Sequence, residues 1–274
     1  MVKKLMAEAS KIEWTDSTFN PWIGCTKISP GCDRCYAERL VTRYRWTLWG
    51  PHGDRKRTSA ANWRKPIQWN SQATVFQAEH SHRQRVFCAS LADVFDNKAD
   101  PTTRADLFEL IKATPNLDWL LLTKRPQLMA RFLPKDWGNG YPNVWLGSTM
   151  EDQERYDQRW PLLRDTPAAI RFISYEPAIG PIVLDAGGTQ PDWIISGGES
   201  GPGSRLMQPA WARAVRDQCQ SRGIAFMHKQ WGNYPSNPIV AEDGKSAKDA
   251  KLSDHDGKGG AILDGRLWRE FPRH

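Results

Sequence analysis

The chain has 274 residues, 39% of them hydrophobic, and this length suffices for one large folded core. Its mean hydropathy of −0.64 and the lack of any long apolar run exclude a transmembrane helix. Residues 1–10 contain lysines but no apolar stretch of signal-peptide length, so we expect a cytoplasmic protein with no membrane partner.

Three of the five cysteines lie together, after a predicted strand over residues 18–24 and at the start of a predicted helix over residues 35–44. In a reducing cytosol such thiols favour metal binding over disulfides. Cys25, Cys32 and Cys35 have the spacing C-x6-C-x2-C, so three thiolates can converge on one metal centre. Three cysteines leave one coordination position unfilled. In a four-iron cluster this leaves one iron without a cysteine ligand, and in a zinc site a further protein ligand or water fills the position.

A basic stretch rich in aromatic residues follows. Between residues 36 and 70, eight basic residues oppose two acidic ones, a net charge of +6 (8 minus 2), and six are tyrosine or tryptophan. Cations attract phosphates and flat rings stack on unpaired bases, so the basic insertion at residues 46–83 is predicted to contact nucleic acid. A solvated basic face with tryptophans beneath it is the alternative. The candidate substrate contacts here are Arg55, Arg57 and Trp63.

Short apolar runs then alternate with helical patterns. Six runs that are apolar on both faces predict buried parallel strands over residues 85–90, 118–123, 143–148, 170–174, 192–196 and 224–228. Helices are predicted over residues 101–113, 153–163 and 209–222, and Cys88 and Cys219 are predicted core thiols. The alternation predicts an α/β fold: a partial or full parallel (β/α) barrel of six to seven strand–helix units, with a doubly wound open sheet as the alternative.

Polar residues follow the predicted strands at their carboxyl ends, where parallel α/β folds bind ligands. Taken singly, several of them are expected to be helix caps or turn residues. Their recurrence after successive strands favours a polar ligand site. The candidates are Ser90, Asp93, Lys124, Arg125, Ser148, Glu151, Glu176, Gly197, Gly198, Glu199, Lys229 and Gln230.

The last part of the chain breaks the alternation. Residues 232–260 are rich in Gly, Asp, Lys and Ser and predict a loop, and an Asp-Gly pair between apolar residues predicts a hairpin over residues 261–271. We therefore expect one barrel domain over residues 1–274, with the insertion at 46–83 and a loop-rich extension at 232–274.

Several motifs resemble those of a known enzyme class. Asn-Pro-Trp-Ile-Gly-Cys at residues 20–25 and Cys-Asp-Arg-Cys-Tyr-Ala at residues 32–37 resemble the cluster loop of radical S-adenosylmethionine (SAM) enzymes, above all the branch that contains spore photoproduct lyase. Nearly the whole chain resembles a phage-associated family of unknown function known for its three-cysteine motif. The matching segments also include residues 90–95, 122–126, 174–177, 197–201 and 229–232.

The resemblance implies a radical SAM barrel with a [4Fe-4S] cluster on the three cysteines, SAM as cofactor and a separate electron donor. With the lyase-like loop and the basic insertion, it predicts modification or repair of a nucleic acid or nucleotide. Glu176 or Glu199 would suit the SAM amine or ribose, and Lys124 or Arg125 its carboxylate. The remaining strand-end candidates complete the predicted cofactor site together with Tyr36, except that Lys229 and Gln230 are assigned to the substrate.

The chain departs from the radical SAM pattern, and two alternatives stay open. The first cysteine gap is three residues longer than usual, Arg34 replaces the usual aromatic residue, and the Gly-Gly-Glu run at 197–199 follows a late strand. The first alternative is a non-catalytic, zinc- or cluster-stabilised nucleic-acid-binding protein. The second is a metal-assisted hydrolase on a barrel, which leaves the cysteines without a role and would use Asp93, Glu151, Glu176 and Glu199.

Overall fold

The computed structural model describes residues 10, 12–249, 251–252 and 258–273. Most of the segment in which no signal peptide is expected, and part of the predicted loop at 232–260, lie outside the described residues. Contacts divide the chain into two compact units. The first comprises the described residues within Met1–Lys27, Ala37–Leu146 and Thr166–Ala169, and the second those within Ile28–Tyr36, Gly147–Asp165 and Ile170–His274. The single barrel domain stays a prediction.

Seven strands form a parallel sheet in the order β1-β4-β5-β6-β7-β8-β9. They span Ser17–Thr18, Arg85–Cys88, Asp118–Thr123, Val144–Thr149, Ile170–Tyr175, Trp193–Gly197 and Ala225–Gln230. All six predicted strands are confirmed, and their ends differ from the predicted ones by at most two residues. They could be predicted because each is a short, mostly apolar run, as is typical of strands buried on both faces. The order begins at β1 and ends at β9, so the sheet is open, as in a partial barrel, and the α/β fold class is confirmed.

Four predicted helices are confirmed as α1 (Tyr36–Arg43), α4 (Pro101–Ala113), α6 (Gln153–Arg164) and α7 (Pro209–Arg222). The structure adds two short helices, α5 (Met129–Phe132) and α8 (Pro238–Ala241), and three turns of 3-10 helix, at Pro30–Cys32, Pro126–Leu128 and Tyr234–Ser236. Among the described residues, no helix combines the length and the apolar character that a membrane span requires.

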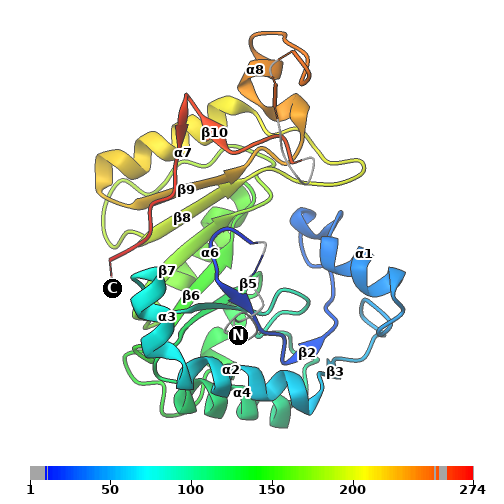
Figure 1. Cartoon of the computed structure of the whole chain (residues 1–274), viewed down its shortest axis with the longest axis vertical. Coiled ribbons are helices and arrows are strands. Elements are labelled where there is room, and N and C mark those ends of the chain that lie inside the picture. The colour runs from blue at the N-terminus through cyan, green and yellow to red at the C-terminus, as the bar shows by residue number, and fades with distance from the viewer. Residues whose placement is uncertain (1–9, 11, 250, 253–257, 274) are drawn as a thin grey trace, which may run out of the picture. The chain divides into compact units, whose positions relative to one another are not determined.

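Besides the short α5, the first unit contains two longer helices that were not predicted from the sequence. The basic insertion folds into α2 (Ala60–Ser71) and α3 (Ala73–His80), and Figure 1 shows α2 beside α4. The Ser59 hydroxyl caps α2 by accepting a hydrogen bond from the Asn62 amide at 3.3 Å. A short antiparallel pair, β2 (Trp22–Ile23) with β3 (Lys56–Arg57), joins the insertion to the residues just before Cys25.

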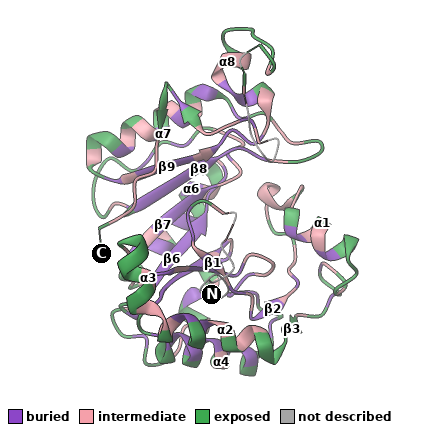
Figure 2. Cartoon of the chain, viewed as in Figure 1, coloured by how far each residue is buried: buried purple, intermediate pink, exposed green. Residues whose placement is uncertain are grey.

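In the second unit, α7 packs on β8 and β9, and the core strands are buried, as Figure 2 shows. The helix ends where expected, at Gly223, whose φ of +69° is readily adopted only without a side chain. The predicted hairpin is confirmed as β10 (Ile262–Leu263) and β11 (Arg266–Leu267). Its turn residues, Asp264 and Gly265, have φ of +51° and +75°, as a two-residue turn between antiparallel strands requires.

Candidate functional site

In the first unit, Asp93 is the centre of a buried hydrogen-bond network beyond the carboxyl ends of β4 and β5. Its Oδ1 accepts hydrogen bonds from the Thr123 hydroxyl at 2.6 Å and the Phe95 amide at 2.9 Å. Its Oδ2 accepts from the Lys124 amide at 3.1 Å and from Arg125 Nη1 at 2.9 Å. The side chains of Asp93 and Arg125 are 7% and 5% exposed, so their opposite charges compensate each other away from water.

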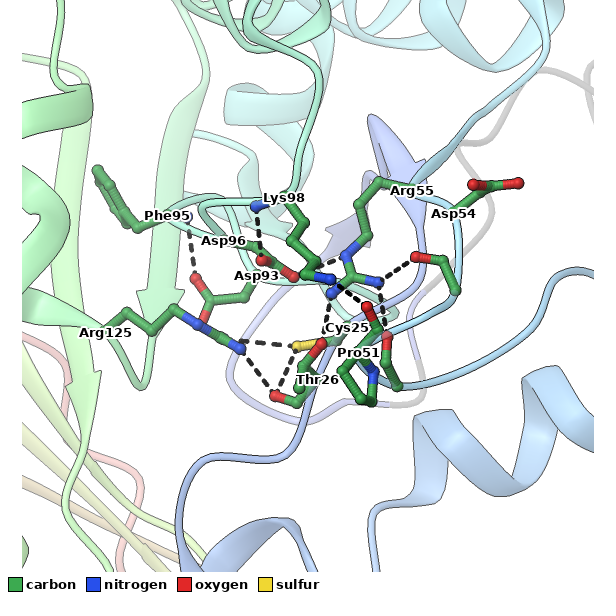
Figure 3. Close-up of polar contacts among 12 residues, drawn as sticks. Cys25, Thr26, Pro51, Asp54, Arg55, Asp93, Phe95, Asp96, Lys98 and Arg125 are labelled. Carbon is green, nitrogen blue, oxygen red and sulfur yellow. Dashed lines mark hydrogen bonds and ion pairs between the residues drawn. The ribbon is translucent and has the colours of Figure 1, made fainter.

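Arg125 connects this network to the first cysteine of the loop, as Figure 3 shows. Its Nη1 lies 3.6 Å from Cys25 Sγ, and its Nη2 donates a hydrogen bond to the Thr26 carbonyl at 2.7 Å. Burial raises the pKa of the Cys25 thiol to about 12, and the negative charge of Asp93 adds to this effect. The thiol is therefore protonated at neutral pH, and a metal must displace this proton when it binds the sulfur.

The residues that lead into Cys25 are held against the end of β4. The Asn20 side chain donates to the Ser90 hydroxyl at 3.0 Å and accepts from the Leu91 amide at 2.7 Å. The Gly24 amide donates to the Leu91 carbonyl at 3.1 Å. Gly24 has a φ of +122°, and a Cβ there would lie 2.7 Å from the Asp54 carbonyl oxygen, so glycine is required. The Asn-Pro-Trp-Ile-Gly run thus fixes where the cysteine loop begins.

The side chain of Arg55, a predicted substrate contact, is buried in the first unit. It forms an ion pair with Asp96 at 2.7 Å, and both side chains are 1% exposed. Its remaining N–H groups donate to the Gly50 and Gly53 carbonyls at 3.2 and 2.8 Å and to the Thr26 hydroxyl at 2.6 Å. As Figure 3 shows, Arg55 fastens the basic insertion to the residue that follows Cys25.

The other two predicted substrate contacts in this unit pack on each other. The guanidinium carbon of Arg57 lies 4.1 Å from the centroid of the Trp63 ring, and its Nη1 pairs with Asp106 at 2.5 Å. The Trp63 ring also meets Phe19 edge-on, with centroids 5.4 Å apart. Both residues therefore contribute to packing between α2 and its surroundings.

In the second unit, Glu151 holds the turn that carries Cys32 and Cys35. This turn includes the 3-10 helix Pro30–Cys32, and the Gly31 amide donates to Glu151 Oε1 at 3.1 Å. Arg159 from α6 binds the other carboxylate oxygen, Oε2, at 2.8 Å. The Glu151 side chain is 0% exposed, so a fully buried carboxylate, compensated by Arg159, orients the cysteine turn.

Glu199 and Arg205 provide a second contact that holds the same turn. Arg205 binds both carboxylate oxygens, with Nε to Oε2 at 3.0 Å and Nη2 to Oε1 at 2.5 Å. Its Nη2 also donates to the Pro30 carbonyl at 2.8 Å, and Arg34 Nη1 lies 3.6 Å from Glu199. Burial alone would raise the pKa of Glu199, but the hydrogen bonds from Arg205 outweigh it and lower the pKa. The carboxylate is therefore ionised and charge-compensated.

The Gly-Gly pair that precedes Glu199 is explained by close packing within the second unit. A Cβ on Gly197 would lie 2.8 Å from Glu176 Oε1, and one on Gly198 would lie 2.0 Å from the Trp231 carbonyl oxygen. Glu176 in turn pairs with Lys229 Nζ at 2.9 Å, and these two side chains are 13% and 19% exposed. The two glycines thus let the ends of β7, β8 and β9 approach one another closely.

Three further predicted site residues differ in accessibility. Ser148 is fully buried, Gln230 is 8% exposed, and Tyr36 is 50% exposed. The Gln230 carbonyl accepts a hydrogen bond from the Gly198 amide at 2.9 Å. All three stay candidates, and Tyr36 is the one open to solvent.

Each carboxylate that a metal-assisted hydrolase would need has a basic partner. Asp93 pairs with Arg125, Glu151 with Arg159, Glu176 with Lys229, and Glu199 with Arg205. Arg159, Arg205 and Asp96 were not predicted, because no local pattern in the sequence marks the partner of a buried charge. The arrangement favours positioning of the loop over binding of a bare cation by acidic groups.

The three loop cysteines are half-buried and outside disulfides. Across the residues that the structure describes, no three His, Cys, Asp or Glu side chains are grouped so that they could hold a metal ion. Cys88 and Cys219 are buried, as expected of core thiols, and burial raises the pKa of each. The metal site thus stays a prediction from the spacing of the three cysteines.

Comparisons with known proteins give structural matches and a family. A double mutant of spore photoproduct lyase, with bound AdoMet and dinucleoside spore photoproduct, is 11% identical, with a TM-score of 0.43 over 81% of this chain and 55% of that chain. A single mutant with the dinucleoside is 14% identical, with a TM-score of 0.42 over 80% and 54%. This chain thus spans about half the length of those structures.

No curated protein matches the chain. A family model described as a protein of unknown function matches residues 9–272. The prediction that the chain belongs to a family of unknown function is confirmed. The association of that family with phages and with a three-cysteine motif stays a prediction. The chain belongs to the family DUF5131.

Proposed function

We propose that this protein is an iron–sulfur enzyme of the radical SAM type that modifies or repairs a nucleic acid or nucleotide. Cys25, Cys32 and Cys35 hold a [4Fe-4S] cluster in this proposal, which leaves one iron for the amino acid end of SAM. A separate donor supplies the electron.

One observation carries the proposal: strand-end residues hold the cysteine loop in each unit. In the first unit, Arg125 contacts Cys25 Sγ at 3.6 Å and the Thr26 carbonyl at 2.7 Å. In the second unit, Glu151 accepts from the Gly31 amide and Arg205 donates to the Pro30 carbonyl, on either side of the turn that carries Cys32. Buried charges that hold a thiol-bearing loop where parallel folds bind ligands support a site built around these thiols.

The donor set fits such a cluster in its chemistry. Thiolates are the usual ligands of four-iron clusters, and the three loop cysteines are half-buried and outside disulfides. Because metal binding and the arrangement of its ligands are coupled, we expect the cluster itself to complete the site. When bound, it supplies the electron that cleaves SAM reductively.

Within the predicted cofactor site, we separate positioning residues from ligand-binding ones. Arg125, Glu151 and Glu199 are assigned to positioning, because their charged groups bond to the cysteine loop or to the arginine that holds it. Lys124 follows β5 and is half-buried, and we assign its ammonium group to the SAM carboxylate. The paired Glu176 and Lys229 are assigned to polar groups of SAM or the substrate.

The nucleic-acid part of the proposal is supported by charge. The net charge of +6 between residues 36 and 70 attracts phosphates, and the tyrosines and tryptophans in the same stretch offer flat rings to bases.

The test is product formation under anaerobic conditions. The full chain is reconstituted with iron and sulfide, reductant and SAM are added, and 5′-deoxyadenosine is measured by mass spectrometry. We expect 5′-deoxyadenosine from the wild type, none above background from Cys32→Ala, and wild-type amounts from Cys219→Ala, whose thiol is in the core. Zinc in place of iron, without cleavage, would support the non-catalytic alternative and reject the proposal.

A further inference from the structure

Two aromatic rings stack on each other at the protein surface, just after α1. The Tyr44 and Trp46 rings lie with centroids 5.4 Å apart and planes inclined by 17°. Tyr44 is 55% exposed and Trp46 is 37% exposed, and Figure 2 shows exposed segments along α1. Their exposed ring surface is available to a partner, and burying aromatic surface is a main source of binding energy.

Backbone hydrogen bonds fix the positions of these two residues. The Tyr44 amide donates to the Leu40 carbonyl at 3.1 Å and so continues the helix, and the Trp46 amide donates to the Val41 carbonyl at 3.1 Å. Arg45 between them has a φ of +52°, the left-handed conformation that commonly ends a helix, and the Tyr44 and Trp46 rings on either side of it are stacked. The helix meanwhile buries Ala37 and Val41, while Arg39 and Arg43 of the same helix are exposed.

Positive charge surrounds the rings. Arg39, Arg43 and Arg45 are exposed, and Arg39 and Arg43 are one helical turn apart on the same face. The guanidinium carbon of Arg43 lies 5.7 Å from the Tyr44 ring centroid, within cation–π range. Glu38, the acidic residue of α1, pairs with Lys27 at 2.7 Å. The local field therefore favours a polyanion.

We propose that Tyr44 and Trp46, with Arg39, Arg43 and Arg45, form a platform that binds single-stranded nucleic acid by base stacking. Exposed rings can accept the faces of unpaired bases, which a duplex hides, while arginines bind the phosphates. This inference rests on the proposed function for the class of substrate, a nucleic acid. It adds that the nucleic acid is single-stranded and that it binds at Tyr44 and Trp46.

The structure favours this platform over the contacts expected from sequence in the same stretch. Arg55 is buried in its ion pair with Asp96, and the Trp63 ring packs between Arg57 and Phe19. Their aromatic and cationic groups are already engaged within the protein, whereas Tyr44 and Trp46 present ring surface to solvent.

Fluorescence anisotropy with the full chain and a labelled oligonucleotide of about 12 nucleotides, within the usual site size, tests the platform. Single-stranded DNA and RNA are compared with the duplex. Trp46→Ala and Tyr44→Ala should each weaken single-strand binding about tenfold, as loss of one stacked base does, and Trp46→Phe should retain most of it. A matched control is Arg266→Ala, which removes an exposed arginine 4.1 Å from another ring, Trp268, and should leave binding unchanged.

Salt dependence gives a second readout. The double variant Arg39→Ala, Arg43→Ala should lower the slope of log Kd against log salt by about 1.4, since each lost phosphate contact to a single strand removes about 0.7. Wild-type affinity in Trp46→Ala and Tyr44→Ala, or tighter binding of the duplex, would overturn the proposal. Because these titrations use neither reductant nor SAM, loss of binding in Trp46→Ala supports the platform even if no 5′-deoxyadenosine forms. Unchanged binding rejects the platform alone.

Discussion

Asp93 compensates the buried charge of Arg125 and accepts three further hydrogen bonds. Asp93→Asn keeps the shape of the side chain but leaves the guanidinium without its counter-charge. We expect the free energy of unfolding to fall by about 3 kcal/mol, the usual cost of removing one partner of a buried ion pair. Urea denaturation followed by tryptophan fluorescence measures the change.

The control for Asp93 is a solvent-exposed pair in the same unit. The side chains of Asp106 and Arg57 are 44% and 45% exposed, so Asp106→Asn should cost less than about 1 kcal/mol. If the two variants lost equal free energy of unfolding, burial would not be the reason that breaking the Asp93–Arg125 pair is costly.

His228 makes stability depend on pH. It is 0% exposed, and no described residue forms a hydrogen bond with either ring nitrogen. Burial, followed by the positive charge of Arg269, lowers the pKa of His228 from 6.5 to about 3. The unfolded chain therefore takes up a proton below pH 6.5 that the folded chain does not. The free energy of unfolding therefore falls as the pH drops from 6.5 towards about 3, by up to about 1.4 kcal/mol per pH unit.

A phenylalanine at this position removes the titration while keeping a ring against Trp231, whose centroid is 4.3 Å away. Comparing the free energy of unfolding at pH 7 and pH 5, we expect a smaller loss for His228→Phe than for the wild type. His80→Phe, at an exposed position, should lose as much as the wild type. If His228→Phe and the wild type lost the same amount, His228 would not be the residue that titrates.

At the scale of elements, Arg205 helps to hold the turn that carries Cys32, because it bridges Glu199 and the Pro30 carbonyl. Hydrogen bonds to charged groups contribute about 1.5–3 kcal/mol each. Arg205→Ala should therefore speed amide hydrogen exchange in residues 28–36 by more than about tenfold, while β8 keeps its protection. Hydrogen-exchange mass spectrometry resolves the two segments.

Arg164→Ala is the matched control for this prediction. Arg164 pairs with the adjacent Asp165 at 2.8 Å on the exposed end of α6. Its loss should leave exchange in residues 28–36 unchanged. Unchanged exchange in Arg205→Ala as well would mean that other contacts, such as the one between Gly31 and Glu151, are sufficient to hold the turn.

The elements also show which parts of a fold a sequence reveals. β5 and β8 were predictable because DWLLLT and DWIIS are continuous apolar runs, and the hairpin because Asp264-Gly265 supports positive φ. α2 was missed because AANWRKPIQWNS carries charges, an internal proline and no clean apolar stripe. Its helical state depends on packing against α4, which a local pattern does not encode.

At the scale of the whole molecule, the cysteine loop draws its support from residues far away in sequence. Arg125 follows Cys25 by 100 residues, Glu151 follows Gly31 by 120, and Arg205 follows Pro30 by 175. The loop itself and the strand-end residues could be predicted, since spacing and position along the chain are local features. Which charge pairs with which depends on the folded chain, so the positioning roles of Arg125, Glu151 and Arg205 became visible only in the structure.

The metal content of the anaerobically reconstituted chain is the decisive measurement for a cluster on Cys25, Cys32 and Cys35. We expect about four iron and four sulfide per wild-type chain, as in a [4Fe-4S] cluster, and the same content in Cys219→Ala. Cys25→Ala, Cys32→Ala and Cys35→Ala should each lose most of it. Iron that is fully retained in any of these three variants, or zinc bound in place of iron by the wild type, would show that the three cysteines do not hold a [4Fe-4S] cluster.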